Sequence, residues 1–253
     1  MIIALLQVII TVLILLWVLK KKTGEPYSKK SVVKFVGFGM IAVVLVLGVS
    51  LMLPDKKNLF ININPLLGGF LAAFLTAALS EELAKYVLFR LAVRKNAEMV
   101  CWLDAIIAAV AVGVGFTILE NLEFSISGDI SILRVLLPGH LLFQWIMGYY
   151  YGKARVTGQA KYHVLSLVVP VAVHTVFDMF IIAMQFVIGG DRSVLSDEAA
   201  LHALPHYGYM IPLAACVIVT MVVSLVALIL MFRKIAVWSK NGGKQELLSG
   251  KDA

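Results

Sequence analysis

The sequence has few charged residues and few cysteines. Only 15% of its 253 residues are charged and 61% are hydrophobic, whereas soluble domains carry about 25% charged residues. This composition excludes an ordinary soluble domain and predicts an integral membrane protein. Cys101 and Cys216 both lie in apolar segments, without a pairing pattern or the spacing of a metal site. The sequence therefore predicts neither a disulfide framework nor a cysteine metal centre.

Three other features are missing from the sequence. It has no internal repeat of the kind found in inverted-repeat transporters. Its first apolar segment has no basic region before it and no Ala-x-Ala-like cleavage site, so we expect an anchor and not a removed signal peptide. The net charge of +7 comes without a basic motif interleaved with aromatic residues, and we expect no nucleic-acid partner.

Seven apolar stretches are long enough to cross a bilayer, for which about 20 residues are needed. They lie at roughly 2–19, 35–53, 65–93, 99–121, 131–151, 164–188 and 208–232. The loops between them are mostly short, which favours a compact bundle of antiparallel neighbours. The predicted fold is therefore all-α, a polytopic membrane helix bundle with about seven transmembrane helices.

The basic residues alternate between the loops. Segments 20–34, 90–95 and 152–162, together with the C-terminal tail, hold most of the 22 Lys and Arg residues. The intervening loops contain only Lys56, Lys57, Arg134 and Arg192. Because loops rich in Lys and Arg face the cytoplasm, we predict an extracytoplasmic N-terminus and a cytoplasmic C-terminus. The positive charge then reflects topology in a lipid bilayer.

The segment from Ser80 to Lys85 places three charges inside the third apolar stretch. A charged side chain at the centre of a spanning helix costs about 2.5–3.5 kcal/mol on insertion scales, and ionisable groups there indicate function by default. On a helix, Lys85 follows Glu82 by three residues and Glu81 by four, so it can offset either charge. The alternative is an ordinary helix end with a solvated Glu–Lys pair.

The next two apolar stretches add further polar groups. In the fourth, Gly113, Phe116 and Glu120 share one helical face, and Asn121 follows Glu120. The alternative is that Glu120 and Asn121 mark the outer end of the helix. The fifth stretch contains His140, which on its own could be an ordinary hydrogen-bonding partner between helices.

The sixth apolar stretch contains His174 and Asp178, four residues apart on one helical face. An aspartate in this position can orient an imidazole, as outer-shell carboxylates do for metal ligands. The alternative is a buried pair that only locks two helices together. Taken together, four consecutive predicted spans carry charged or imidazole groups, and such groups almost always face the bundle interior or a wet cavity.

Carboxylates combined with imidazoles fit three kinds of chemistry: binding a divalent metal, moving protons, or activating water for hydrolysis. A transporter coupled to protons or cations could use the same groups, and a non-catalytic seven-span receptor or scaffold is a third class. A shared water or metal site requires the side chains to converge, whereas a scaffold predicts scattered pairs. The positions that decide between these classes are Glu81, Glu82, His140 and His174.

The motifs resemble those of the PrsW family of intramembrane proteases, over roughly Pro65 to Phe180. They follow one another on successive predicted spans: Glu81-Glu82-x-x-Lys85, Gly115-Phe116-x-x-x-Glu120-Asn121, His140 with Met147 to Arg155 downstream, and His174-x-x-x-Asp178. The family is similar to the CAAX prenyl protease and bacteriocin-processing superfamily, where a Glu-Glu pair and a His-x-x-x-Asn motif line a cavity in the membrane. Asp178 stands where that Asn would be, which favours the PrsW branch.

The resemblance implies a membrane-embedded endopeptidase, a multi-pass protein of the bacterial plasma membrane. Its substrate would be a membrane-embedded protein with a single span, such as an anti-sigma factor, cut at the first site of a stress-response cascade. One of Glu81 and Glu82 would be the general base, and the other would pair with Lys85. Asn121 would donate a hydrogen bond to the substrate, and Asp178 would orient its histidine.

The expected metal ligands are Glu120, His140 and His174, with Zn²⁺ as the expected ion if a metal is used. Without a metal, the histidines would stabilise an oxyanion directly. A helix rise of about 1.5 Å per residue places Glu81 nearer the cytoplasm, Glu120 nearer the outside, and both histidines near the midplane. Glu120 can therefore serve as a metal ligand only if helix packing brings it to the depth of the two histidines.

We expect three parts along the chain. Residues 1–60 form two N-terminal transmembrane anchors with a basic cytoplasmic loop, and residues 61–188 form a four-span catalytic core. Residues 189–253 comprise an outer loop, the last transmembrane helix and a disordered cytoplasmic tail rich in Gly, Lys and Ser. The resemblance covers the core only, so it says little about the first two spans and the last.

Overall fold

The computed structural model describes residues 2–22, 24–52, 59–60, 63–127, 139–189 and 208–240, and all of its regular elements in these ranges are helical. The all-α bundle predicted from the sequence is confirmed. The elements are α1 (Ile2–Leu19), α2 (Lys29–Ser50), α4 (Pro65–Ala72), the π-helical turn η1 (Ala73–Ala78), α5 (Leu79–Val93), α6 (Trp102–Ser127), α8 (Gly139–Thr157), α9 (Ala160–Gly189) and α11 (Met210–Lys240).

Within the described ranges, five helical stretches are long and apolar enough to cross a membrane: Lys29–Ser50, Pro65–Val93, Trp102–Ile126, Ala160–Val187 and Met210–Lys240. In the described part of α1, the apolar stretch Leu5–Leu19 is shorter, and α8 is not among the five. The count of seven spans and their direction across the membrane remain predictions. Residues 131–138 of the fifth predicted span, most of the predicted outer loop and most of the predicted tail lie outside the described residues.

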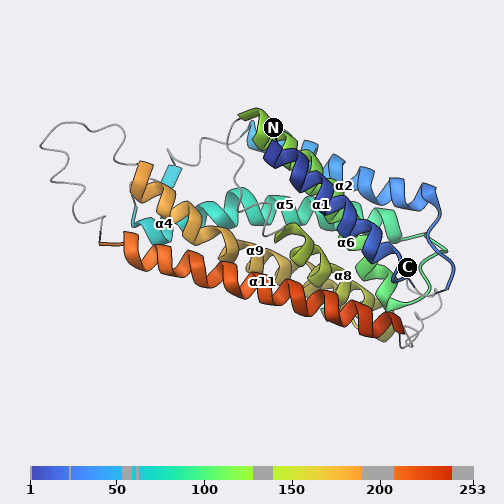
Figure 1. Cartoon of the computed structure of the whole chain (residues 1–253). Helices are drawn as coiled ribbons and strands as arrows, with labels where there is room; N and C mark the ends of the chain where they lie inside the picture. Colours follow the sequence, from blue (N-terminus) through green and yellow to red (C-terminus); the bar gives the residue numbers. More distant parts are fainter. Residues whose placement is uncertain are drawn as a thin grey trace, which may run out of the picture.

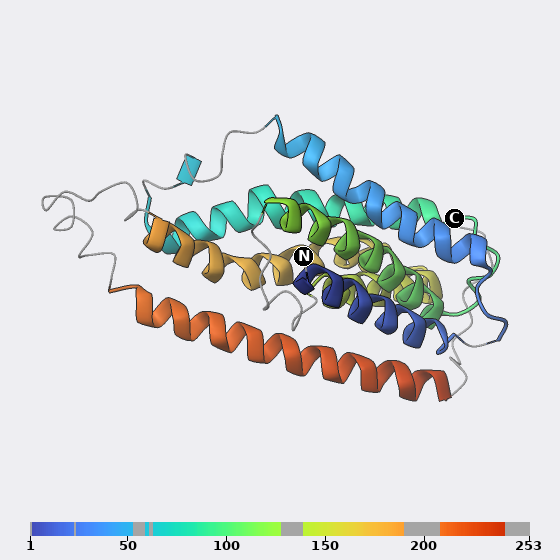
Figure 2. The same ribbon diagram turned by 45° about the horizontal axis from the view of Figure 1, so that its top comes forward.

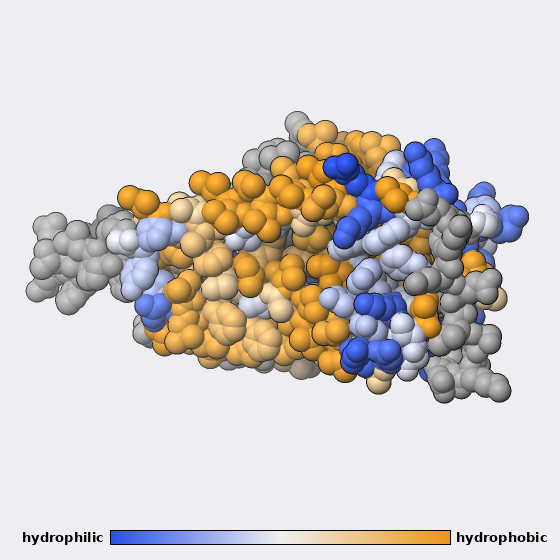
Figure 3. All heavy atoms as spheres, turned by 90° about the horizontal axis from the view of Figure 1, so that it is seen from below, coloured by the Kyte–Doolittle hydropathy of each residue, from blue (hydrophilic) through white to orange (hydrophobic). Residues whose placement is uncertain are grey.

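The helices lie side by side as neighbours of alternating direction (Figure 1). The α1–α2, α5–α6 and α8–α9 connections and the C-terminal end of α11 all lie at one end of the bundle (Figures 1 and 2). This is the end where the sequence places the basic segments. Figure 3 shows hydrophilic side chains gathered toward that end and apolar ones covering most of the remaining face. On α11, Ile218, Val219 and Val223 are each at least 60% exposed, as expected for lipid contact.

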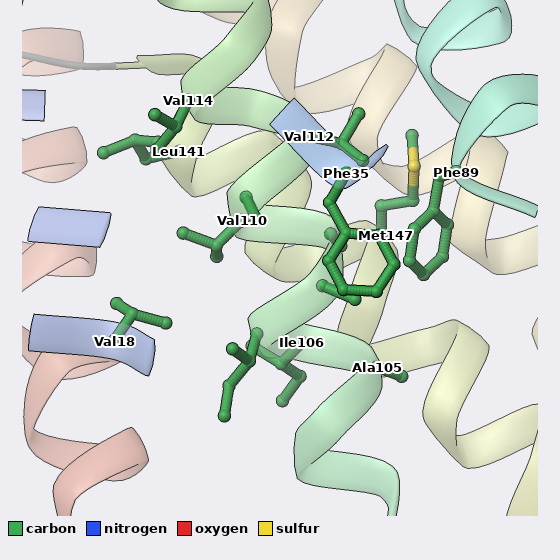
Figure 4. Close-up of a cluster of buried hydrophobic side chains, with 14 of the residues drawn as sticks. Val18, Phe35, Phe89, Ala105, Ile106, Val110, Val112, Val114, Leu141 and Met147 are labelled. Atoms are coloured by element: carbon green, nitrogen blue, oxygen red, sulfur yellow. The ribbon is translucent and has the colours of Figure 1, made fainter. Parts of the chain in front are cut away.

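The central helix of the bundle is α6, which is apolar on all sides over most of its length. Its side chains Ala105, Ile106, Val110, Val112 and Val114 are fully buried, the pattern of a helix surrounded by others. Figure 4 shows residues from the neighbouring helices that surround it. They are Val18 of α1, Phe35 of α2, Phe89 of α5, and Leu141 and Met147 of α8.

Two glycines allow α2 and α6 to cross closely. A Cβ built on Gly39 of α2 would overlap the carbonyl oxygen of Val112, and one on Gly115 of α6 would overlap that of Val36. Small residues that let two backbones approach are a common device for packing helices in membranes. Gly115 belongs to the Gly-Phe-x-x-x-Glu motif, so this part of the motif serves helix packing.

We expect Gly39→Ala to destabilise the protein by about 1–3 kcal/mol, because the added methyl group would force apart two backbones that are already in contact. Gly37→Ala on the same helix is the matched control, since nothing lies within 4 Å of a Cβ at that position. It should leave the melting temperature unchanged or slightly raised, because Ala favours helix over Gly by up to about 1 kcal/mol. Thermal unfolding in detergent measures both. Equal melting temperatures for the two variants would contradict this account of the crossing.

The start of α6 is fixed by Asp104, the third residue of the helix. Its Oδ2 accepts hydrogen bonds from the backbone N–H groups of Val100 and Cys101, at 2.8 and 3.1 Å. The hydroxyl of Tyr27 donates to the Asp104 carbonyl at 3.0 Å, which ties the α1–α2 connection to the same point. In the neighbouring loop, the backbone N–H of Ser28 donates to Glu98 Oε2 at 2.9 Å. Hydrogen bonding to Ser28 stabilises the carboxylate and lowers the pKa of Glu98.

Helices α4 and α5 form one continuous rod, Pro65–Val93, interrupted by the π-helical turn η1. Asn64 caps its start, because its side chain accepts from the backbone N–H groups of Leu66 and Leu67. Within the π-helical turn, the hydroxyl of Thr76 donates to the Ala72 carbonyl at 2.7 Å. π-helical turns are frequent at functional sites, and this one ends directly before Ser80 and the glutamate pair.

Candidate active site

Four helices bring their polar side chains to one place inside the bundle. Each of Glu81, Glu82, His140 and His174 offers one donor atom, and these atoms all lie within 4.8 Å of one another. The residues come from α5, α8 and α9, and Glu120 of α6 joins them through His140. The convergence required for a shared water or metal site is therefore present. These residues form one cluster, whereas a non-catalytic scaffold would be expected to contain separate pairs.

Glu82 is the most enclosed member of the cluster, with no exposed side-chain surface. Its Oε1 accepts from Lys85 Nζ at 2.9 Å and faces His174 Nδ1 at 3.0 Å. Its other oxygen, Oε2, accepts from the amide of Gln144 at 3.0 Å. Hydrogen bonds at both oxygens hold this carboxylate in one position. Removal of its charged partner Lys85 would leave a buried charge uncompensated.

Glu81 differs from Glu82 in two respects. Its side chain keeps 12% of its surface exposed, and its hydrogen bond is a single one, from Lys85 Nζ to Oε2 at 3.1 Å. Among the described residues, no group donates to its Oε1. Both expected pairings of Lys85, across three and four residues, are thus confirmed. Glu81 retains an oxygen that can accept a proton or contact a ligand.

His140 is held at both ring nitrogens. Nδ1 lies 3.0 Å from Lys85 Nζ, and Nε2 lies 2.7 Å from Glu120 Oε2. Since an ammonium can only donate, Nδ1 accepts and Nε2 carries the ring proton. The edge of the ring also meets the face of Phe116, with centroids 4.8 Å apart. Helix rise alone places Glu120 at a different depth, yet packing brings it into direct contact with His140.

His174 has the corresponding arrangement on α9. Its Nδ1 faces Glu82, and its Nε2 lies 3.1 Å from Asp178 Oδ2. The ring of Phe143 stacks on it, with centroids 4.4 Å apart and planes inclined by 20°. The expected contact between Asp178 and its histidine is therefore present, and the ring is fixed by a carboxylate at one edge and an aromatic face on one side.

The donor set suits a divalent cation. His174 Nδ1 lies 3.0 Å from Glu82 Oε1, and His140 Nδ1 lies 3.9 Å from Glu81 Oε2. Each ring places Nε2 against an outer carboxylate, which is the usual second shell of a metal-bound histidine. In the described part of the chain, four carboxylates surround the site with a single lysine among them, and buried charges are normally paired or coordinate metals. The residues that fit a metal are Glu81, Glu82, His140 and His174. Glu120, which the sequence predicts as a ligand, contacts Nε2 of His140, on the opposite side of the ring from Nδ1.

Asn121 lies next to Glu120 and is 1% exposed. Neither its amide oxygen nor its amide nitrogen has a hydrogen-bond partner among the described residues. An unsatisfied buried amide is costly, at about 1–3 kcal/mol, and such a group in a native structure requires an explanation. Its predicted role as a hydrogen-bond donor to a substrate remains a prediction that this geometry allows.

Sequence reasoning missed two residues of the site: Gln144, which donates to Glu82, and Phe143, which stacks on His174. Phe116 was part of a motif but had no expected role, and the centroid of its ring lies 3.5 Å from Lys85 Nζ. Gln144 fits because a Cβ on Gly113 would come within 2.7 Å of its Cγ. The spacing offered one signal, since Gln144 follows His140 by four residues and so shares its helical face.

The sequence matches a known protein family over most of its length. Residues 27–231 match the model of the PrsW family intramembrane metalloproteases. The chain belongs to this family. The match includes α2 to α9 and most of α11, and so contains every residue of the cluster. PrsW membership was expected from the four motifs, and it is confirmed.

Individual relatives agree with the family match. The protease PrsW of Bacillus subtilis is 34% identical over 125 residues, which are 47% of this chain and 57% of the relative. That of Geobacillus kaustophilus is 34% identical over 119 residues, 45% of this chain and 53% of the relative. The match to these two therefore spans little more than half of their length. The Clostridioides difficile protease PrsW is 27% identical over 198 residues, 72% of this chain and 79% of the relative. No solved structure matches.

Proposed function

We propose that this protein is an intramembrane endopeptidase that hydrolyses peptide bonds of membrane-tethered substrates. The observation that carries the proposal is the convergence of Glu81, Glu82, His140 and His174 within 4.8 Å inside an apolar helix bundle. Family membership supports it, because the relatives are named proteases. The substrate that suits such a site is a single-span protein of the bacterial plasma membrane, such as an anti-sigma factor.

In this mechanism Glu81 is the general base. Its Oε1 takes a proton from a water molecule while the water oxygen attacks the carbonyl carbon of the peptide bond. As the C–N bond breaks, the same carboxyl group returns the proton to the leaving amine. Glu81 suits this role because it is partly exposed and has an oxygen without a donor among the described residues.

The other residues hold the site together. Glu82 is fixed by Lys85, Gln144 and His174, and Glu120 and Asp178 orient the two imidazoles. Glu82, His140 and His174, together with the Glu81 oxygen that does not take the proton, would hold a divalent metal, expected to be Zn²⁺, which when bound supplies Lewis-acid polarisation of a carbonyl oxygen. The amide of Asn121 has no partner among the described residues and would donate to the substrate backbone.

The test is cleavage of a tethered single-span substrate in proteoliposomes. We expect the wild type to cleave it and the double variant Glu81→Ala, Glu82→Ala to lose cleavage entirely, because both carboxylates leave the site. The double variant Lys153→Ala, Lys161→Ala is the control and should cleave normally, because both ammonium groups contact the ring of Tyr162 and neither belongs to the cluster. Full cleavage by the double glutamate variant would contradict the proposal. Proton flux into the vesicles without cleavage would indicate a transporter instead.

A further inference from the structure

The Lys85 ammonium group lies at the point where the candidate metal ligands meet. Its Nζ is 3.1 Å from Glu81 Oε2, 2.9 Å from Glu82 Oε1 and 3.0 Å from His140 Nδ1. An ammonium has three N–H donors, so each has one acceptor. The ring of Phe116 covers a further side, at 3.5 Å from Nζ to the centroid. Lys85 has no exposed surface.

The three atoms that accept hydrogen bonds from Lys85 belong to Glu81, Glu82 and His140. These are three of the four residues that fit a metal. The decisive atom is Nδ1 of His140, because a ring nitrogen has only one lone pair. The other nitrogen of this ring carries its proton toward Glu120 at 2.7 Å, so His140 can bind a metal only through Nδ1. That lone pair cannot accept from Lys85 and bind a cation at about 2.0–2.1 Å at the same time.

We propose that Lys85 is an internal cation that competes with the metal ion for this site. The inference rests on the proposed function, since it concerns how the metal would enter the proposed active site. Lys85 holds the two glutamates and His140 together through its three hydrogen bonds. A metal ion binds only when the ammonium group withdraws from Nδ1, and its apparent affinity is lowered by the contacts that must be broken.

The charge around the site explains why such a residue is useful. Glu81, Glu82, Glu120 and Asp178 bring four carboxylates into a largely dry interior, and uncompensated buried charges are strongly destabilising. Lys85 offsets part of this charge before any metal is present. It therefore allows the bundle to fold without metal. A cation occupies the site only if its binding free energy exceeds the cost of breaking the contacts of Lys85.

The test compares Zn²⁺ binding by wild type and Lys85→Met in nanodiscs, by competition with a chromogenic chelator. We expect the Zn²⁺ dissociation constant of Lys85→Met to fall at least about tenfold, since no charge-assisted hydrogen bond has to be broken for the ion to enter. Its melting temperature should fall without Zn²⁺ and recover with it. Lys34→Met removes a lysine outside the cluster, which contacts the Ala92 carbonyl and the Phe38 ring, and it should bind Zn²⁺ like the wild type. An unchanged or weaker affinity of Lys85→Met would overturn the inference.

A second variant keeps the test valid if Lys85→Met does not fold. Phe116→Leu removes the aromatic face from the ammonium group but retains the lysine and all four candidate ligands. We expect it to bind Zn²⁺ a few times more tightly, and unchanged or weaker binding would count against competition. Cleavage without any Zn²⁺ binding would overturn the inference and leave the protease function standing. Zn²⁺ binding that follows the expected order without cleavage would support the competition and contradict the function.

Discussion

Glu81→Gln should lower the rate of substrate cleavage by about 10²–10⁴-fold, the usual contribution of a general base, and leave the melting temperature close to that of the wild type. The amide cannot take a proton from water. It can still accept the hydrogen bond from Lys85, which is the single one this side chain makes with the described residues. Because the side chain is partly exposed, the loss of its charge costs little stability.

Glu82→Gln should behave differently, although it changes the neighbouring residue in the same way. It leaves Lys85 and His174 without their shared carboxylate in a fully buried position, and breaking a buried pair by removing one partner costs about 3–5 kcal/mol. Thermal unfolding in detergent and cleavage in proteoliposomes together separate the two roles. A folded Glu82→Gln protein without activity, next to an active Glu81→Gln, would reverse the assignment of the base.

His174→Ala should weaken Zn²⁺ binding by at least about 100-fold and abolish most cleavage. Loss of an outer-shell partner alone costs about 10–100-fold in metal affinity, and this substitution removes a candidate ligand together with the link between Glu82 and Asp178. Metal content by mass spectrometry and chelator competition measure the first effect. The proteoliposome assay measures the second.

His163→Ala is the matched control on the same helix. His163 lies outside the cluster, against the ring of Tyr151 at a centroid distance of 5.4 Å. It should retain Zn²⁺ and cleavage. If His174→Ala bound Zn²⁺ like the wild type, the ion would not be held at the cluster, and the proposed metal role of Glu81, Glu82, His140 and His174 would be wrong.

Sequence reasoning located the cluster because charge is expensive in a membrane. Glu82, Lys85 and His174 stand out in apolar stretches, and the requirement that such groups find one another predicts their convergence. The direct contacts of Lys85 with both glutamates follow from helical spacing alone. The all-α fold follows from composition and segment length.

The remaining details depend on how helices pack, which sequence spacing does not contain. Depth estimated from helix rise separates Glu120 from His140, whereas the two side chains touch at 2.7 Å. Gln144 is neutral and therefore gives no charge signal, although it holds Glu82. The ends of α11 also depend on context, since the helix continues to Lys240, beyond the apolar stretch predicted to end at residue 232.

The π-helical turn Ala73–Ala78 has a consequence for how this protein tolerates changes in chain length. A π turn bonds each residue to the one five positions along, so it holds a surplus residue compared with an α turn. Loss of one residue upstream of Leu79 can be taken up by tightening this turn. The same loss within an ordinary α-helix would rotate everything beyond it by about 100°. The π-helical turn thus lies just before the glutamate pair. There it can preserve the direction in which Glu81 and Glu82 project into the site.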